Sequence, residues 1–143
     1  MATIPVGIQP INLDVHPYIN RIYVVNKFKN TVSVIDGLTN TVIATIPVGE
    51  QPSDLGVNLS NNRIYTANTN SNTVSVIDGL TNTVIGIIPV VSRPTTIDVN
   101  ESNNQIHVTN ETNSVVSVID GVTNIVIASL PVGEQPLYTI IDS

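Results

Sequence analysis

Residues 30–43 read Asn-Thr-Val-Ser-Val-Ile-Asp-Gly-Leu-Thr-Asn-Thr-Val-Ile, and the same fourteen residues return unchanged at 72–85. A shorter third copy at 116–127 reads Val-Ser-Val-Ile-Asp-Gly-Val-Thr-Asn-Ile-Val-Ile. Corresponding residues of successive copies lie 42 positions apart, and a fixed period of about 20–50 residues is typical of repeat proteins. The 143 residues form one repeat domain with repeats 4–45, 46–87 and 88–129 and a partial fourth repeat, 130–143.

Within one repeat, apolar and polar residues alternate with a period of two, which is typical of half-buried strands. No segment has the apolar spacing or the capping residues of a helix. Asp36-Gly37-Leu38-Thr39-Asn40 is the turn residue cluster of a hairpin. The pattern predicts four short strands per repeat, which in the first repeat cover 11–15, 20–26, 31–35 and 41–47.

The third strand is apolar on both of its faces, because Val32 and Val34 point to one side and Ile35 to the other. A sheet with one face in water would not carry this pattern, whereas a sheet between two similar sheets would. Four-stranded units of about 40 residues that stack face to face are the blades of a β-propeller. The fold class expected is therefore all-β, with β-propeller blades. A stacked β-solenoid and a β-sandwich are the alternatives.

The ends of the second strands carry a recognisable motif. They read Tyr23-Val24-Val25-Asn26, Tyr65-Thr66-Ala67-Asn68 and His107-Val108-Thr109-Asn110. This motif resembles the Tyr-Val-Thr-Asn signature of the YVTN family of β-propeller repeats, and His107 departs from it. The resemblance implies a propeller fold. It also implies a binding or structural module, since such repeats occur in surface-layer and other envelope proteins.

On a propeller scheme the chain supplies three blades, at 8–48, 50–90 and 92–132, with the end of an outer strand at 1–6 and a lone inner strand at 136–143. Three blades do not close a ring, because propellers have roughly 4–8. The chain is therefore expected to be part of a longer propeller or to assemble head to tail. A homodimer with six blades is the simplest assembly. The overhanging terminal strands do not complete a blade, so a trimer and an open fragment are the alternatives.

Composition restricts the partners. The five Lys and Arg residues are dispersed and the net charge is −6, so no basic stripe is available for nucleic acid or an anionic membrane. The chain has no cysteine, which excludes disulfides and thiolate sites. No apolar run approaches the ~18 residues of a spanning helix, so membrane insertion is not expected, and the N-terminus does not read as a signal peptide. An extracellular or envelope location is expected if the chain belongs to an exported parent.

Two sets of recurring polar residues read as turn formers. Asp36, Asp78 and Asp120 each precede a glycine, so the carboxylate is expected to accept backbone N–H groups while the glycine takes a positive φ. The Asn residues are expected to tolerate left-handed backbone and to satisfy loop amides. We call residues at the same position of successive repeats, 42 apart, a column. The Asn residues occupy two columns, Asn26, Asn68 and Asn110 at the strand ends and Asn40, Asn82 and Asn124 in the hairpins.

No catalytic constellation is visible. His16 and His107 lie in different columns of the repeat and neither has a metal-ligand partner at a suitable spacing, so no resident cofactor is expected. The alternative function is a propeller enzyme of the lyase or lactonase type with a site in the central channel. The inner-strand positions available for it are Asp14, Gly56, Asp98 and Ile140. Calcium between Asp14 and Asp98 carboxylates of assembled chains is the one cofactor considered.

The loop after the second strand differs in sequence between repeats, although the repeat pattern around it is kept. Such variation is typical of loops that carry binding residues on a rigid scaffold. It reads Lys27-Phe28-Lys29 in the first repeat and Thr69-Asn70-Ser71 in the second. Phe28 is the only Phe and stands between two lysines. Lys27, Phe28 and Lys29, with the channel-facing Asp14 and Asp98, are the candidate surface for a protein or glycan. Neutral drift at tolerant positions is the alternative reading.

Overall fold

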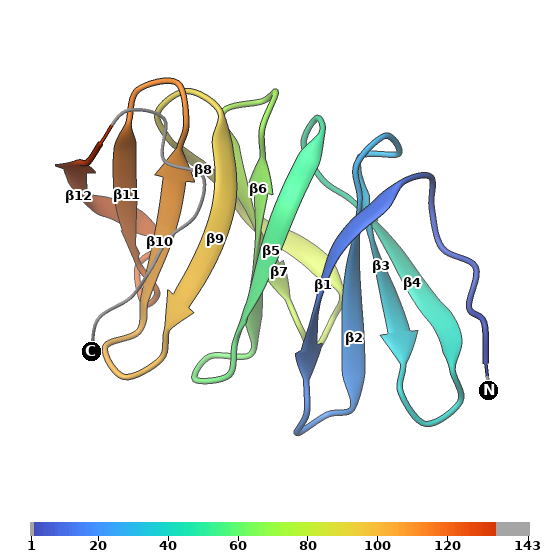
Figure 1. Cartoon of the computed structure of the whole chain (residues 1–143). Helices are drawn as coiled ribbons and strands as arrows, with labels where there is room; N and C mark the ends of the chain where they lie inside the picture. Colours follow the sequence, from blue (N-terminus) through green and yellow to red (C-terminus); the bar gives the residue numbers. More distant parts are fainter. Residues whose placement is uncertain (1, 134–143) are drawn as a thin grey trace.

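The computed structural model of this protein describes residues 2–133, and over this range it is built of three antiparallel four-stranded sheets (Figure 1). Blade 1 consists of β1 (Pro10–His16), β2 (Arg21–Asn26), β3 (Thr31–Asp36) and β4 (Thr41–Pro47). Blade 2 consists of β5 (Pro52–Asn58), β6 (Arg63–Asn68), β7 (Thr73–Asp78) and β8 (Thr83–Pro89). Blade 3 consists of β9 (Pro94–Asn100), β10 (Gln105–Asn110), β11 (Val115–Asp120) and β12 (Ile125–Pro131).

Each sheet is a simple meander whose strands pair in sequence order. The register repeats with the sequence, so that Tyr23 faces Val34 in blade 1 and Tyr65 faces Val76 in blade 2. The third and fourth strands of each blade share one register shift, which in blade 1 falls between Val34 and Ile35. The predicted four strands per repeat are confirmed.

The blades follow one another as an open arc, with the first strands β1, β5 and β9 next to one another at the front of Figure 1. The fourth strands β4 and β12 form the opposite edges of their sheets. The predicted propeller fold with an incomplete ring is confirmed. Residues 2–6 are not in a strand, so the predicted end of an outer strand at this place is wrong for them. The inner strand predicted at 136–143 lies outside the described residues.

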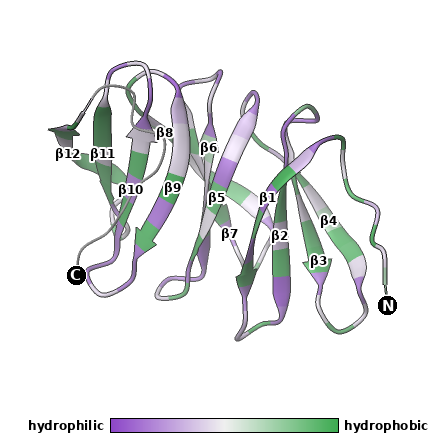
Figure 2. Cartoon of the chain, viewed as in Figure 1, coloured by the Kyte–Doolittle hydropathy of each residue, from purple (hydrophilic) through white to green (hydrophobic). Residues whose placement is uncertain are grey.

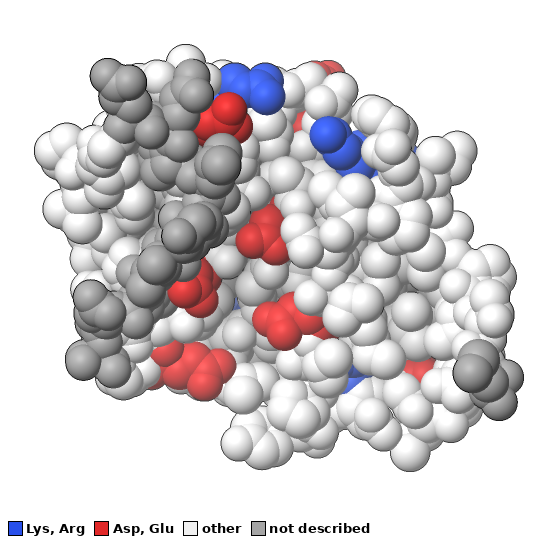
Figure 3. Space-filling model, in the orientation of Figure 1, with Lys and Arg blue, Asp and Glu red and all other residues white. Residues whose placement is uncertain are grey.

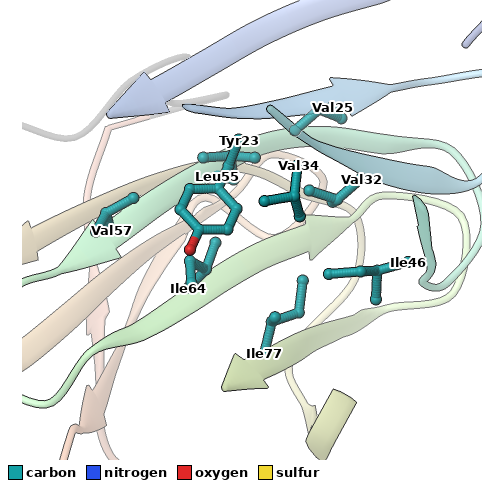
Figure 4. Close-up of a cluster of buried hydrophobic side chains, with 9 residues drawn as sticks. All are labelled: Tyr23, Val25, Val32, Val34, Ile46, Leu55, Val57, Ile64 and Ile77. Atoms are coloured by element: carbon teal, nitrogen blue, oxygen red, sulfur yellow. The ribbon is translucent and has the colours of Figure 1, made fainter. Parts of the chain in front are cut away.

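The core lies between the blades. Figure 4 shows side chains of blades 1 and 2 facing one another, with the Tyr23 ring near Leu55 and Ile64. This first cluster consists of Tyr23, Val25, Val32, Val34 and Ile46 from blade 1 and Leu55, Val57, Ile64 and Ile77 from blade 2. A second cluster, between blades 2 and 3, contains Tyr65, Val74, Val76, Ile88, Ile97, Ile106 and Ile119.

The middle blade is therefore apolar on both faces, as the pattern of its third strand predicts. Val74 and Val76 pack toward blade 3, while Ile77 packs toward blade 1. Figure 2 shows the hydrophobic residues concentrated on the strands. Complete burial of each such side chain stabilises the fold by about 1.5–3 kcal/mol. Blade stacking thus supplies the main favourable term, and an isolated blade would lack it.

The hairpin turns are partly as predicted. The Asp36 Oδ1 atom accepts a hydrogen bond from the Leu38 backbone N–H at 2.8 Å, and Asn40 is left-handed with a φ of 57°. The prediction for the glycines is wrong, because no glycine among the described residues has a positive φ. A side chain is excluded there for another reason: a Cβ atom on Gly79 would lie 2.7 Å from Asn62 Oδ1 and 2.8 Å from its carbonyl oxygen.

The Asn residues at the ends of the second strands form a different structure from the one predicted. Asn26 is buried and extended, because it pairs with Thr31 as the last residue of β2. Its side-chain nitrogen donates to Ser33 Oγ at 2.9 Å, and its Oδ1 accepts the Gly7 N–H at 3.2 Å. Asn26 therefore satisfies a loop amide, as predicted, but the prediction of left-handed backbone is wrong for this column. Left-handed asparagines occur elsewhere, at Asn20, Asn30, Asn40, Asn62, Asn72, Asn82, Asn104 and Asn124.

Candidate functional site

The first strands carry carboxylates that join neighbouring blades. Asp14, on β1, accepts two backbone hydrogen bonds, from Val15 at 2.8 Å through Oδ1 and from Val57 of β5 at 3.0 Å through Oδ2. A first strand pairs with another strand on only one edge, so its other edge presents N–H groups that need an acceptor. The predicted channel residue Asp14 therefore holds blade 1 against blade 2.

Asp54 makes the equivalent connection between blades 2 and 3. Its Oδ1 accepts the Leu55 N–H and its Oδ2 accepts the Ile97 N–H of β9, each at 2.9 Å. Burial raises the pKa of the Asp54 carboxyl above its ordinary value, although the two N–H donors act in the opposite direction. The charges of Asp14 and Asp98 add to the rise in this pKa.

Sequence reasoning missed Asp54 because it considered only the column of Asp14, where blade 2 has Gly56. The signal that could have identified Asp54 is the column two residues before that of Asp14, which is polar in every blade, with Asn12, Asp54 and Thr96. A Cβ atom on Gly56 would lie 2.9 Å from Ile97 Cγ2, so β5 approaches β9 too closely there for a side chain.

Asp98 is in the same column as Asp14, and no further blade follows its own within residues 2–133. Among residues 2–133 its carboxylate accepts no hydrogen bond, and it lies opposite His107 in the strand register. Burial lowers the pKa of His107, and the negative charge of Asp98 opposes this effect. The Nδ1 atom of His107 is buried and has no hydrogen-bond partner among the described residues.

Acidic side chains gather on the front face of the arc, over the first strands (Figure 3). In the described part of the chain, no three His, Asp or Glu side chains approach closely enough to hold a metal ion. Asp14 and Asp54 already bond backbone N–H groups. A single chain therefore provides no assembled calcium site within residues 2–133. Ile140, the fourth inner position, lies outside them.

Tyr65 also connects two blades, whereas the Tyr23 hydroxyl is buried without a hydrogen-bond partner among the described residues. The Tyr65 hydroxyl donates to Asn124 Oδ1 of blade 3 at 3.1 Å and accepts from Asn61 Nδ2 at 3.3 Å. His107 occupies the corresponding position of blade 3. Its departure from the motif therefore falls on the side chain that would meet a following blade.

Lys27, Phe28 and Lys29 form the turn between β2 and β3. The Lys27 Nζ atom lies 5.7 Å from the centre of the exposed Phe28 ring. The Lys27 N–H donates to the carbonyl of Gln9, immediately before β1. Asp14 is five residues further along this strand, which is about 16 Å at 3.3 Å per residue. The structure therefore places the Phe28 turn and Asp14 at separate sites.

His16 and Tyr18 lie beside the opposite turn of blade 1. Their rings are 6.2 Å apart in an edge-to-face arrangement. His16 is buried, Tyr18 is exposed, and the His16 Nδ1 atom has no partner among the described residues. Within the described part of the chain, His16 belongs to no group of three His, Asp or Glu side chains that could hold a metal ion.

The two end blades expose side chains that the middle blade buries. We call the face of a blade toward the preceding blade its upstream face, and the opposite face its downstream face. On the upstream face, Leu13 is 62% exposed and Val15 is 43% exposed, whereas Leu55 and Val57 in the same columns are 4% and 6% exposed. An apolar hollow of about 430 Å³ opens there, lined by Pro10, Ile11, Asn12, Leu13 and Val24.

The downstream face of blade 3 is open at its outer strand. Leu130 is 47% exposed, whereas Ile46 and Ile88 in the same column are 3% and 4% exposed. Val116 and Val118, on β11, are buried. Both ends of the arc therefore carry apolar residues of the kind that form the cores between blades.

No model of a protein family matches this chain, and no curated protein matches it. Among solved structures, the chain is similar to the hydrazine synthase of Kuenenia stuttgartiensis, a β-propeller-containing protein, with a TM-score of 0.85 and 22% sequence identity. The similarity covers 90% of this chain and 38% of that chain. At this identity it establishes the fold alone, which is that of β-propeller blades. No helix in residues 2–133 could span a membrane.

Proposed function

We propose that this chain is a non-catalytic β-propeller module of the YVTN type that completes its ring by self-association. In this proposal it binds a protein or glycan, or has a structural role, at a cell surface. The observation that carries the proposal is the open upstream face of blade 1. Leu13 and Val15 are exposed on blade 1 although the same residues, Leu55 and Val57, are buried one repeat later.

The proposed absence of a catalytic role is supported by the hydrogen bonds that the aspartate side chains make within the fold. The carboxylates of Asp14 and Asp54 each bond two backbone N–H groups. A general acid or base needs to exchange protons with a substrate, which a carboxylate committed in this way does poorly. The Asp36 carboxylate likewise accepts a hydrogen bond from the Leu38 N–H within its own turn.

The binding part of the proposal is supported by the turn of Lys27, Phe28 and Lys29. An exposed aromatic ring beside two cations offers an apolar face and positive charge to a ligand, on a protein of net charge −6. The corresponding turn of blade 2, Thr69-Asn70-Ser71, carries neither. The cell-surface location rests on the resemblance to YVTN repeats.

Small-angle X-ray scattering of the full chain tests the ring. We expect a closed disc with a central channel, and an open three-blade arc at all concentrations would contradict the proposal. A glycan array tests the binding role. Phe28→Ala and Lys29→Ala should remove any signal that wild type gives, whereas Asn70→Ala, in the matched turn of blade 2, should keep it. Retention of every signal by both Phe28→Ala and Lys29→Ala would overturn this binding surface.

A further inference from the structure

We propose that blade 1 separates from the rest of the arc as a unit, while blades 2 and 3 stay together. The opening takes place at the junction between blades 1 and 2, which we call the seam. In a repeat fold each unit contacts only its neighbours, so the weaker of two interfaces opens first. The seam and the junction between blades 2 and 3 both lie within residues 2–133, and they differ in their polar contacts.

Apolar packing does not distinguish the two junctions. The cluster at the seam and the cluster between blades 2 and 3 each contain nine buried residues. Each junction also has a carboxylate that crosses between first strands. At the seam Asp14 accepts the Val57 N–H, and at the other junction Asp54 accepts the Ile97 N–H. The difference lies at the end of the blades where the first strand turns into the second.

The turn between β5 and β6 is bonded to blade 3. The Leu59 N–H donates to Glu101 Oε1 at 2.9 Å. The Asn61 Nδ2 atom donates to the Gly121 carbonyl oxygen at 3.0 Å, and it also lies 3.3 Å from the Tyr65 hydroxyl of its own blade. Blades 2 and 3 are therefore joined by directional contacts at this end as well as by apolar packing.

The corresponding turn of blade 1, Pro17-Tyr18-Ile19, cannot form these bonds. Pro17 is in the column of Leu59 and has no backbone N–H to donate. The column of Glu101 contains Leu59 in blade 2, and leucine has no side-chain acceptor. Ile19 is in the column of Asn61, and its side chain has no donor. The sequence of the turn thus removes these contacts from the seam.

The tyrosine at the seam lacks the partner that its counterpart has. The Tyr65 hydroxyl donates to Asn124 Oδ1 across the junction between blades 2 and 3 at 3.1 Å. The same two columns at the seam contain Tyr23 and Asn82. The Tyr23 hydroxyl and the Asn82 Oδ1 atom are buried, and neither has a hydrogen-bond partner in the part of the chain that the structure describes.

A second pair of columns shows the same difference. The Asn58 and Asn104 side chains bond across the junction between blades 2 and 3, with Nδ2 and Oδ1 2.6 Å apart. At the seam these columns contain His16 and Asn62, whose Nδ1 and Oδ1 atoms are buried without a partner within residues 2–133. An unpaired buried polar atom favours a state in which water reaches it. Opening the seam hydrates such atoms, whereas opening the other junction breaks hydrogen bonds.

Two matched amides report the two openings separately. The Val57 N–H crosses the seam, and the Ile97 N–H crosses the junction between blades 2 and 3, each to an aspartate. Hydrogen exchange of the full chain is followed by NMR, and each rate is corrected for the intrinsic rate of its amide. We expect Val57 to be protected less than Ile97 by about tenfold or more. Equal protection of the two amides would contradict the seam.

Two variants exchange the character of the junctions. Ile19→Asn supplies at the seam the donor that Asn61 provides to blade 3, so it should slow the exchange of Val57 about tenfold and leave Ile97 unchanged. Asn61→Ile removes that donor from the other junction, so it should accelerate the exchange of Ile97 by a similar factor and leave Val57 unchanged.

Asn103→Ile is the matched control, because Asn103 is in the same column, is exposed and bonds Gln105 within its own blade. It should change neither amide. Equal changes of Val57 and Ile97 in Ile19→Asn or Asn61→Ile would show that the blades open together and would overturn the proposal. Unchanged exchange of Val57 in Ile19→Asn would also overturn it, and this variant remains informative if Asn61→Ile does not fold.

Discussion

The Oδ2 atom of Asp14 lies 3.0 Å from the backbone nitrogen of Val57, so one carboxylate joins the first strands of two blades. Its other oxygen accepts the N–H of Val15 in its own strand. The contact between blades 1 and 2 otherwise consists mainly of non-directional apolar packing. The carboxylate therefore adds a directional connection that fixes how one blade sits on the next.

Asp14→Ala should lower the free energy of unfolding by about 1.5–3 kcal/mol, which is the usual value of a hydrogen bond to a charged group. Asp14→Asn keeps one acceptor oxygen and should lose less. Urea denaturation followed by circular dichroism measures both changes. If Asp14→Ala were as stable as wild type, the contact to Val57 would contribute nothing to blade packing.

The raised pKa of Asp54 gives a pH dependence of known sign. The folded state binds the Asp54 proton more tightly than the unfolded state, whose pKa is near 3.8. The stability that this group contributes is complete below that value and is lost as pH rises through the folded pKa. Relative to Asp54→Asn, the melting temperature of wild type should therefore fall between pH 4 and 7. A constant difference across this range would contradict the shift.

The lowered pKa of His107 acts at the other end of the range. The folded state favours the neutral imidazole, so its contribution to stability is present above the ordinary pKa of 6.5 and is lost as pH falls through the lowered value. His107→Tyr restores the residue of the other two blades and should remove this acid sensitivity. Thermal melts at pH 5 and 8 check it, and an unchanged pH dependence in His107→Tyr would refute it.

Two glycines should respond to alanine in opposite ways. A Cβ atom on Gly56 would meet Ile97 Cγ2 at 2.9 Å and Val99 Cγ2 at 3.0 Å, so Gly56→Ala should cost about 1–3 kcal/mol through overpacking. At Gly86 the nearest atoms would be 3.7 Å away, and the other blades have Ala44 and Ala128 there.

Gly86→Ala should therefore raise the stability by about 0.5–1 kcal/mol, because alanine loses less backbone entropy on folding. Chemical denaturation of the two variants side by side is the measurement. A Gly56→Ala protein as stable as Gly86→Ala would show that β5 and β9 are further apart than the structure places them.

The sequence was sufficient to predict the blades, because strand alternation and the 42-residue period both depend on local pattern. Because Val34 and Ile35 are consecutive residues of one strand, the sequence alone predicts that they are buried on opposite faces of the sheet. The contacts between blades were not predictable in this way. Whether a carboxylate reaches the next strand depends on the spacing between sheets, which is why Asp54 was missed. The backbone of Gly37 was also wrongly predicted, since the close approach of Asn20 rather than a turn conformation requires glycine there.

The candidate site was predicted only in part for the same reason. Asp14 and Asp98 were identified as residues of the first strands, but their different roles depend on whether a blade follows. Asp14 has Val57 as a partner, and Asp98 has no corresponding partner in the described part of the chain. The position of Phe28 relative to Asp14 depends on the direction and length of β1 and β2. The prediction from the residue pattern did not take these into account.

The central claim is that three blades are completed by a second copy. Light scattering coupled to size-exclusion chromatography, over a range of chain concentrations, measures this most directly. We predict a mass of twice the 15.3 kDa of one chain, with dissociation on dilution. A single species at 15.3 kDa that persists at the highest concentrations would contradict the claim.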